Sequence, residues 1–265
     1  MARARLLAPV LAVSLLASGV GAPQAQAYSV SVDKDSDVCT ITYTDSDKIN
    51  VNNAYSGLFL RLAQEVRDSF ESEKSKADAA IVYDYGIRED VKRASDPPIP
   101  ATPPVNGAQL RLALGGEKDK YWQMVGFINA SKKEVITRQT LTMTREEARK
   151  NGGVTYGVPL GDIAGGVIGG LFFGGEIADV RDAILNGAQK YAPEFAVPIA
   201  LYAKSFKDCE EGKSTSSSIM PGSAMTSSQA TGLGIAGLIV GLLSLVGIGF
   251  AMRPAIDQFM AQFAR

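Results

Sequence analysis

The feature that most constrains this chain is an uncharged, strongly apolar stretch of 21 residues near its C-terminus, Gly232–Met252. At about 1.5 Å of rise per residue, a helix of this length spans roughly 30 Å, the thickness of the hydrocarbon core of a bilayer. The sequence therefore predicts one C-terminal transmembrane helix over residues 232–252.

A second apolar stretch, at the N-terminus, has the features of an export signal. Arg3 and Arg5 precede the apolar residues 6–20, and Ala25-Gln26-Ala27 is a small-x-small cleavage site. We expect residues 1–27 to be a signal peptide, with an uncleaved N-terminal anchor as the alternative.

The charges beside the predicted span indicate its orientation. Arg253 follows the span directly, whereas residues 214–231 before it carry no charge. The positive-inside rule therefore agrees with the export signal. We expect a protein of the cytoplasmic membrane, with the bulk of the chain on the extracytoplasmic side and residues 253–265 as a cytoplasmic amphipathic tail.

Small residues recur at three- and four-residue spacing within the predicted span. On a helix they form one stripe, which allows two membrane helices to approach closely. We interpret the stripe as a helix-packing face for a second copy or another membrane protein, although glycine is also frequent in membrane helices in general. Its members are Gly234, Gly237, Gly241, Ser244 and Gly247.

A second glycine pattern lies in residues 157–177 and forms a doubled glycine zipper. Three interpretations stay open: a segment packed inside the domain, an exposed apolar patch that contacts a partner or a membrane, and a second membrane span. The glycines at four-residue spacing are Gly161, Gly165 and Gly169, and Gly166, Gly170 and Gly174.

The chain has two cysteines, Cys39 and Cys209. An even number of cysteines in an exported chain favours a disulfide, with two free thiols as the alternative. The bridge would connect a residue near the mature N-terminus to one just before the linker. It would therefore close nearly the whole exported domain.

Between the two ends, the sequence predicts a mainly helical exported domain over residues 28–212, of the α+β class because it begins with a small β-hairpin. Residues 28–43 alternate around an aspartate-rich turn, which is typical of a hairpin. Ser, Thr and Gly dominate residues 213–231, which we interpret as a flexible linker.

Helical spacing of apolar residues predicts the clearest helix over residues 51–74, with a weaker one over 76–94. A further helix is expected over 118–129, and Thr144 and Glu147 have the spacing of a capping box. Two more helices are expected to close the domain, one over residues 177–188 and one starting at Pro193.

The absence of histidine excludes several kinds of site. Without this residue the chain cannot form a Ser-His-Asp triad, a His-ligated metal site or an imidazole pH switch. The acidic run Asp33-x-Asp35-x-Asp37 lacks the glycine and glutamate of a calcium-binding loop. We expect no cofactor and no metal ion, and a net charge of −1 without a basic block argues against a nucleic-acid partner.

In layout, the chain resembles exported, C-terminally membrane-anchored cell-envelope proteins of actinobacteria. The resemblance rests on the segment VCTITYTDSD (residues 38–47) after a short mature start, on the single cysteine pair, and on the Ser-rich linker before a glycine-rich terminal span. It implies a location in the cell envelope and nothing about catalysis.

These features together favour a non-enzymatic accessory or structural subunit of a membrane complex. One alternative is a cell-wall hydrolase that uses carboxylates alone. The other is a membrane-perturbing or pore-forming protein that acts through residues 157–177. The carboxylates available for the hydrolase lie on the polar face of the first predicted helix: Glu65, Asp68, Glu71 and Glu73.

Overall fold

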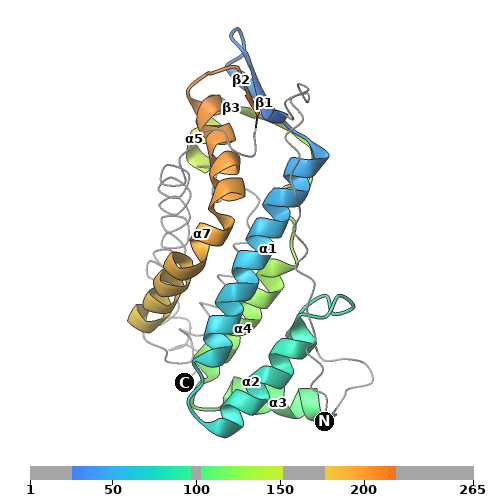
Figure 1. The fold of residues 1–265 in the computed structure, drawn as a ribbon, viewed down its shortest axis with the longest axis vertical. Helices are drawn as coiled ribbons and strands as arrows, with labels where there is room; N and C mark the ends of the chain where they lie inside the picture. The colour runs from blue at the N-terminus through green and yellow to red at the C-terminus, as the bar shows by residue number, and fades with distance from the viewer. Residues whose placement is uncertain (1–25, 97–102, 152–176, 219–265) are drawn as a thin grey trace, which may run out of the picture.

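The computed structural model describes residues 26–96, 103–151 and 177–218 (Figure 1). Most of the predicted signal peptide, nearly all of residues 157–177 and the predicted span and tail lie outside these ranges. None of the helices in the described ranges combines the length and apolar character needed to cross a bilayer. The glycines proposed for helix packing and the zipper glycines also lie outside the described residues.

The described residues form a helical bundle with a small antiparallel sheet at one end, as the α+β prediction requires (Figure 1). Helix α1 (Asp45–Asp68) packs between α4 (Lys118–Ser131) and α7 (Ile177–Glu210). Helices α2 (Glu73–Gly86) and α3 (Pro103–Leu114) pack together at the end of the bundle opposite the sheet.

The sheet has the order β3-β2-β1-β4, with each neighbouring pair antiparallel. The predicted hairpin is confirmed as β1 (Gln26–Asp33) and β2 (Val38–Tyr43). Two strands that the sequence did not predict flank it, β3 (Thr140–Thr144) and β4 (Thr215–Ser218). Four residues of the predicted linker are therefore paired with β1 rather than irregular.

Helix α1 begins six residues earlier than predicted and also ends earlier. Thr44 provides the reason, because it forms a capping box with Asp47: the Thr44 hydroxyl accepts the Asp47 N–H at 3.2 Å, and Asp47 accepts the Thr44 N–H at 3.0 Å. Ser69 ends the helix. The predicted apolar face is confirmed, since all of its members are buried: Leu58, Phe59, Leu62, Val66 and Phe70.

Thr44→Ala is expected to lower the free energy of unfolding by about 1 kcal/mol, because the helix loses its N-cap. Ser46→Ala removes a hydroxyl from the exposed first turn of the same helix and is the matched control, with an expected change below about 0.5 kcal/mol. Urea unfolding of both variants measures the difference. Equal values for the two would contradict the assigned cap.

Helix α7 corrects the prediction of two closing helices. It is one helix of 34 residues that continues through Pro193 and Pro198. Each proline lacks an N–H and removes one helical hydrogen bond. Burial of Ile199, Tyr202 and Phe206 beyond the prolines offsets this loss. In Figure 1 the golden half of α7 is tilted against the orange half that approaches the sheet.

The other helices agree with the sequence in part. Helix α4 matches the predicted segment 118–129, and α5 (Arg145–Asn151) starts at the predicted capping box, in which Glu147 accepts the N–H of Thr144 at 2.8 Å. Helix α2 ends well before residue 94. Helix α3 was not among the helices expected from the sequence. It starts at Pro103, a residue well suited to a first helical position.

Candidate functional site

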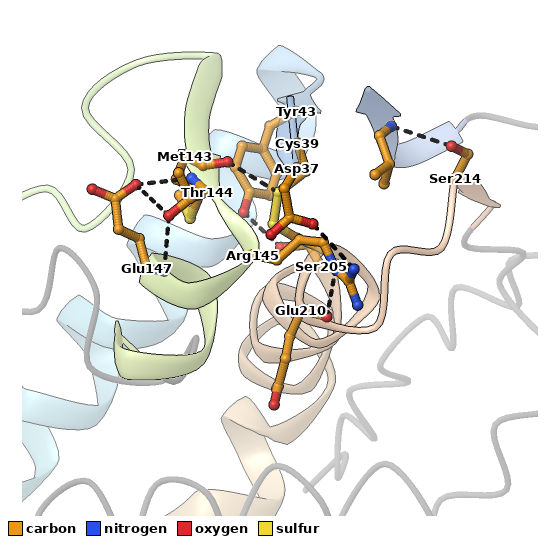
Figure 2. Close-up of a disulfide and its surroundings, with 12 residues drawn as sticks. Asp37, Cys39, Tyr43, Met143, Thr144, Arg145, Glu147, Ser205, Glu210 and Ser214 are labelled. Carbon is orange, nitrogen blue, oxygen red and sulfur yellow. Dashed lines mark hydrogen bonds and ion pairs between the residues drawn. A yellow bond between two sulfur atoms is a disulfide. The ribbon is translucent and has the colours of Figure 1, made fainter. Parts of the chain in front are cut away.

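The predicted cysteine pair is confirmed as a disulfide between β2 and the end of α7 (Figure 2). Cys39 and Cys209 are fully buried, and their Cα atoms are 5.7 Å apart across a sequence separation of 170 residues. The bridge fixes the sheet to the last turn of the longest helix.

Polar contacts around the disulfide join the same elements (Figure 2). The Tyr43 hydroxyl lies 2.7 Å from the Ser205 hydroxyl, which connects β2 to α7. The Arg145 guanidinium donates to the Glu210 carbonyl at 3.0 Å and to the Asp37 carboxylate at 3.1 Å. The turn between β1 and β2, the start of α5 and the end of α7 therefore meet at one arginine.

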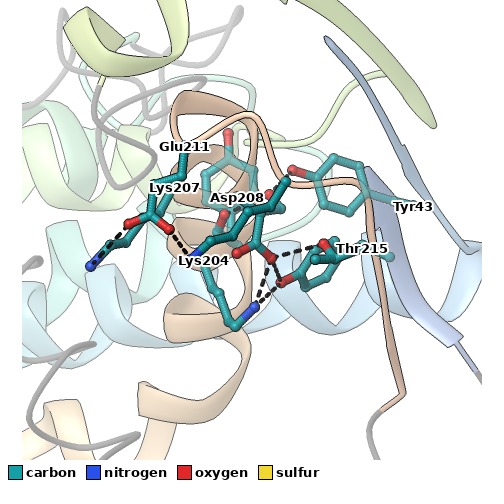
Figure 3. Close-up of polar contacts among 10 residues, drawn as sticks. Tyr43, Lys204, Lys207, Asp208, Glu211 and Thr215 are labelled. Carbon is teal, nitrogen blue, oxygen red and sulfur yellow. Dashed lines mark hydrogen bonds and ion pairs between the residues drawn. The ribbon is translucent and has the colours of Figure 1, made fainter. Parts of the chain in front are cut away.

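A buried carboxylate, Asp208, forms the second connection at this end (Figure 3). It is 5 % exposed and accepts hydrogen bonds from Tyr28 at 2.8 Å, Lys204 at 2.6 Å and Thr215 at 3.0 Å. Burial alone would raise the pKa of Asp208. The hydrogen bonds from Lys204, Tyr28 and Thr215 outweigh it and hold the pKa below its ordinary value.

We call the disulfide and the contacts of Asp208 the sheet-end clamp. Tyr28 lies on β1 and Thr215 lies on β4, so the clamp holds the first and last described strands against α7. The two strands are also direct neighbours in the sheet. The chain therefore enters and leaves this domain at the same end.

A cavity of about 160 Å³ lies beside the clamp, between the sheet, the first turns of α1 and α7. Asp47 lines it and is 8 % exposed. Burial raises the pKa of Asp47 above its ordinary value, although the hydrogen bonds from Thr44 act in the opposite direction. The remaining lining residues are Tyr28, Tyr43, Asn50, Val51, Val197, Pro198, Leu201 and Tyr202.

A larger and more open cavity, of about 430 Å³, lies between α2 and α3 at the opposite end. Arg111 binds Asp78 there through two hydrogen bonds of 2.7 and 2.5 Å. The pKa of Asp78 is lowered chiefly by these bonds. Beside the pair, Leu110 and Leu114 lie one helical turn apart and are 61 % and 73 % exposed.

The four carboxylates considered for a hydrolase do not form a common site. Glu65 binds Lys190 and Tyr191, and these hydrogen bonds lower its pKa, whereas a general acid needs a raised one. The other three are exposed and paired with separate cations: Asp68 with Arg67, Glu71 with Lys120, and Glu73 with Lys76. Their arrangement gives the hydrolase alternative no support.

The sequence did not indicate the importance of Asp47, Asp208 or the two exposed leucines. One local signal existed for Asp208, because Lys204 precedes it by one helical turn next to the apolar face that ends at Cys209. Nothing local indicated that β4 would supply its third partner.

Comparison with protein-family models, with curated proteins and with solved structures gave no match to this chain. The geometry of the described residues is therefore the basis on which a function can be argued.

Proposed function

We propose that this protein is a single-pass, membrane-anchored accessory or structural subunit of a membrane complex in the cell envelope, and that it acts by binding a partner rather than by catalysis. The observation that carries this proposal is the sheet-end clamp. It holds β1, which includes the last two residues of the predicted signal peptide, Gln26 and Ala27, beside the strand that precedes the predicted span. A domain attached at one end in this way leaves its other end free for contacts.

The proposed orientation follows from lengths along the chain. Thirteen residues, 219–231, separate β4 from the predicted span, and if they form the flexible linker that the sequence predicts, a linker of this length extends over about 20 Å on average. Helix α1 has 24 residues, so it runs for roughly 36 Å from the sheet towards α2. The sheet end would face the membrane, and α2 and α3 would point away from it.

The α2–α3 end offers the surface that fits a partner best. Leu110 and Leu114 form an exposed apolar pair next to an open cavity. Contacts with another protein would remove this pair from water. The stripe of small residues predicted for residues 232–252 would provide a second contact inside the membrane.

The test is cross-linking of the full chain in its native membrane, followed by co-purification. We expect Leu110→Ser combined with Leu114→Ser to reduce a specific cross-linked adduct roughly tenfold, the effect of losing about 1.4 kcal/mol of binding free energy. Ile49→Ser is the matched control, because Ile49 is 57 % exposed but lies at the sheet end. Gly237→Leu combined with Gly241→Leu tests the predicted span separately. An adduct that survives both double variants would contradict the proposal.

A further inference from the structure

The cavity beside the sheet-end clamp has room for a ligand. Its volume of about 160 Å³ is roughly ten times the 10–15 Å³ that a single water requires on the same kind of measure. Val197 is 48 % exposed and Asn50 is exposed, so the cavity opens to solvent between α7 and α1. A small molecule can therefore enter without unfolding the domain.

Three tyrosines from three different elements line this cavity: Tyr28 on β1, Tyr43 on β2 and Tyr202 on α7. The hydroxyls of Tyr28 and Tyr43 already bind Asp208 and Ser205, which are not among the lining residues. Lys204 Nζ already lies 5.8 Å from the centroid of the Tyr28 ring, so a ligand cation would contact chiefly the rings of Tyr43 and Tyr202. Aromatic rings attract cations through their electron-rich faces, and alkylated ammonium groups suit such surroundings especially well.

Asp47 adds a negative charge to the same cavity. The hydrogen bonds that it accepts from Thr44 all fall on Oδ2. None of the ion pairs among the described residues includes Asp47. A buried carboxylate without a cation is unfavourable, and a positively charged ligand would compensate it.

The remaining lining residues indicate which kind of cation the cavity suits. Val51, Pro198 and Leu201 present hydrocarbon to the cavity. In the described parts of the chain no cluster of Asp, Glu, Cys or His could hold a metal ion. An apolar wall, aromatic rings and one carboxylate suit an alkylated ammonium group better than a hydrated inorganic ion.

We propose that this cavity is a binding site for a small organic cation, such as a quaternary or primary ammonium group, held by Asp47 and by the rings of Tyr43 and Tyr202. The site does not depend on membrane anchorage or on the α2–α3 surface. The ammonium group can belong to a free solute or to a lipid headgroup.

The test is isothermal titration calorimetry of the full chain in phosphatidylglycerol nanodiscs, in phosphate buffer free of organic amines. Tetramethylammonium and choline are expected to bind, and the uncharged choline isostere 3,3-dimethyl-1-butanol is expected to bind at least about tenfold more weakly, which corresponds to 1.4 kcal/mol. Equal binding of the isostere would overturn the proposal, as would the absence of binding by either cation.

Two variants assign the site. Asp47→Asn is expected to weaken choline binding about tenfold, whereas Asp45→Asn, which removes the same charge from the exposed first turn, should leave it within about twofold. Val197→Trp fills the cavity from its exposed rim and should abolish binding without removing a charge. Equal effects of the two aspartate variants, or unchanged binding by Val197→Trp, would overturn the assignment.

The composition of the nanodisc distinguishes the two sources of the ammonium group. If a lipid headgroup occupies the cavity, phosphatidylcholine nanodiscs should reduce the fraction of sites open to added choline relative to phosphatidylglycerol nanodiscs. If the ligand is a free solute, the affinity for choline should be the same in both lipids.

Discussion

Cys39→Ala combined with Cys209→Ala is expected to lower the free energy of unfolding by about 5 kcal/mol, the largest effect that we predict for this chain. The bridge joins residues 170 apart, so it restricts nearly the whole domain in the unfolded state. It also fixes β2 to α7.

Guanidinium unfolding of the oxidised and the reduced wild-type chain separates the effect of the bond from that of the two buried side chains. The reduced wild-type protein should lose most of the stability that the double variant loses. A difference below about 1 kcal/mol between the oxidised and reduced forms would contradict a bridge that restricts the unfolded chain.

Asp208→Ala is expected to lower the free energy of unfolding by about 3 kcal/mol at neutral pH, because three hydrogen bonds to a buried carboxylate are lost together. The hydroxyls of Tyr28 and Thr215 then lose their acceptor. Lys204 contributes less to this value, since its side chain is 43 % exposed and solvent screens its charge.

The effect of Asp208 should depend on pH in a defined direction. Its pKa in the folded protein lies below the ordinary value of 3.8. The electrostatic part of its contribution is therefore fully present above pH values near 3.8 and is lost as the pH falls through the folded pKa. The difference between wild type and Asp208→Ala should shrink in acid.

Urea unfolding at neutral pH and at a pH near 2.5 measures both predictions for Asp208. Asp84→Ala on the exposed face of α2 is the matched control and should change the free energy of unfolding by less than about 0.5 kcal/mol at either pH. A difference between wild type and Asp208→Ala that is the same at both pH values would contradict the role assigned to the carboxylate.

The sequence predicted those elements whose signal is local. Alternation around residues 33–37 predicted the hairpin, and apolar spacing predicted the buried face of α1. The cysteine count predicted the bridge. Strand β4 was missed because its sequence, Thr-Ser-Ser-Ser, is typical of a linker. Pairing with β1, and not the residues themselves, makes it a strand.

The remaining errors have the same physical origin. Pro193 is a good first residue for a helix, but tertiary packing of the residues beyond it keeps α7 continuous. No role was predicted for Asp47. Its place beside three tyrosines depends on contacts between β1, β2 and α7, which no local pattern encodes.

The central claim is that the domain closed by the sheet-end clamp is anchored to a membrane and is oriented with its sheet end nearest the bilayer. The most direct measurement is resonance energy transfer in nanodiscs, from a dye on the lipid surface to a label on a single added cysteine. We predict strong transfer to Lys34→Cys on the β1–β2 turn and weak transfer to Leu114→Cys on α3, since α1 alone runs for roughly 36 Å between the two ends. Equal transfer to both labels, or no transfer to either, would contradict the claim.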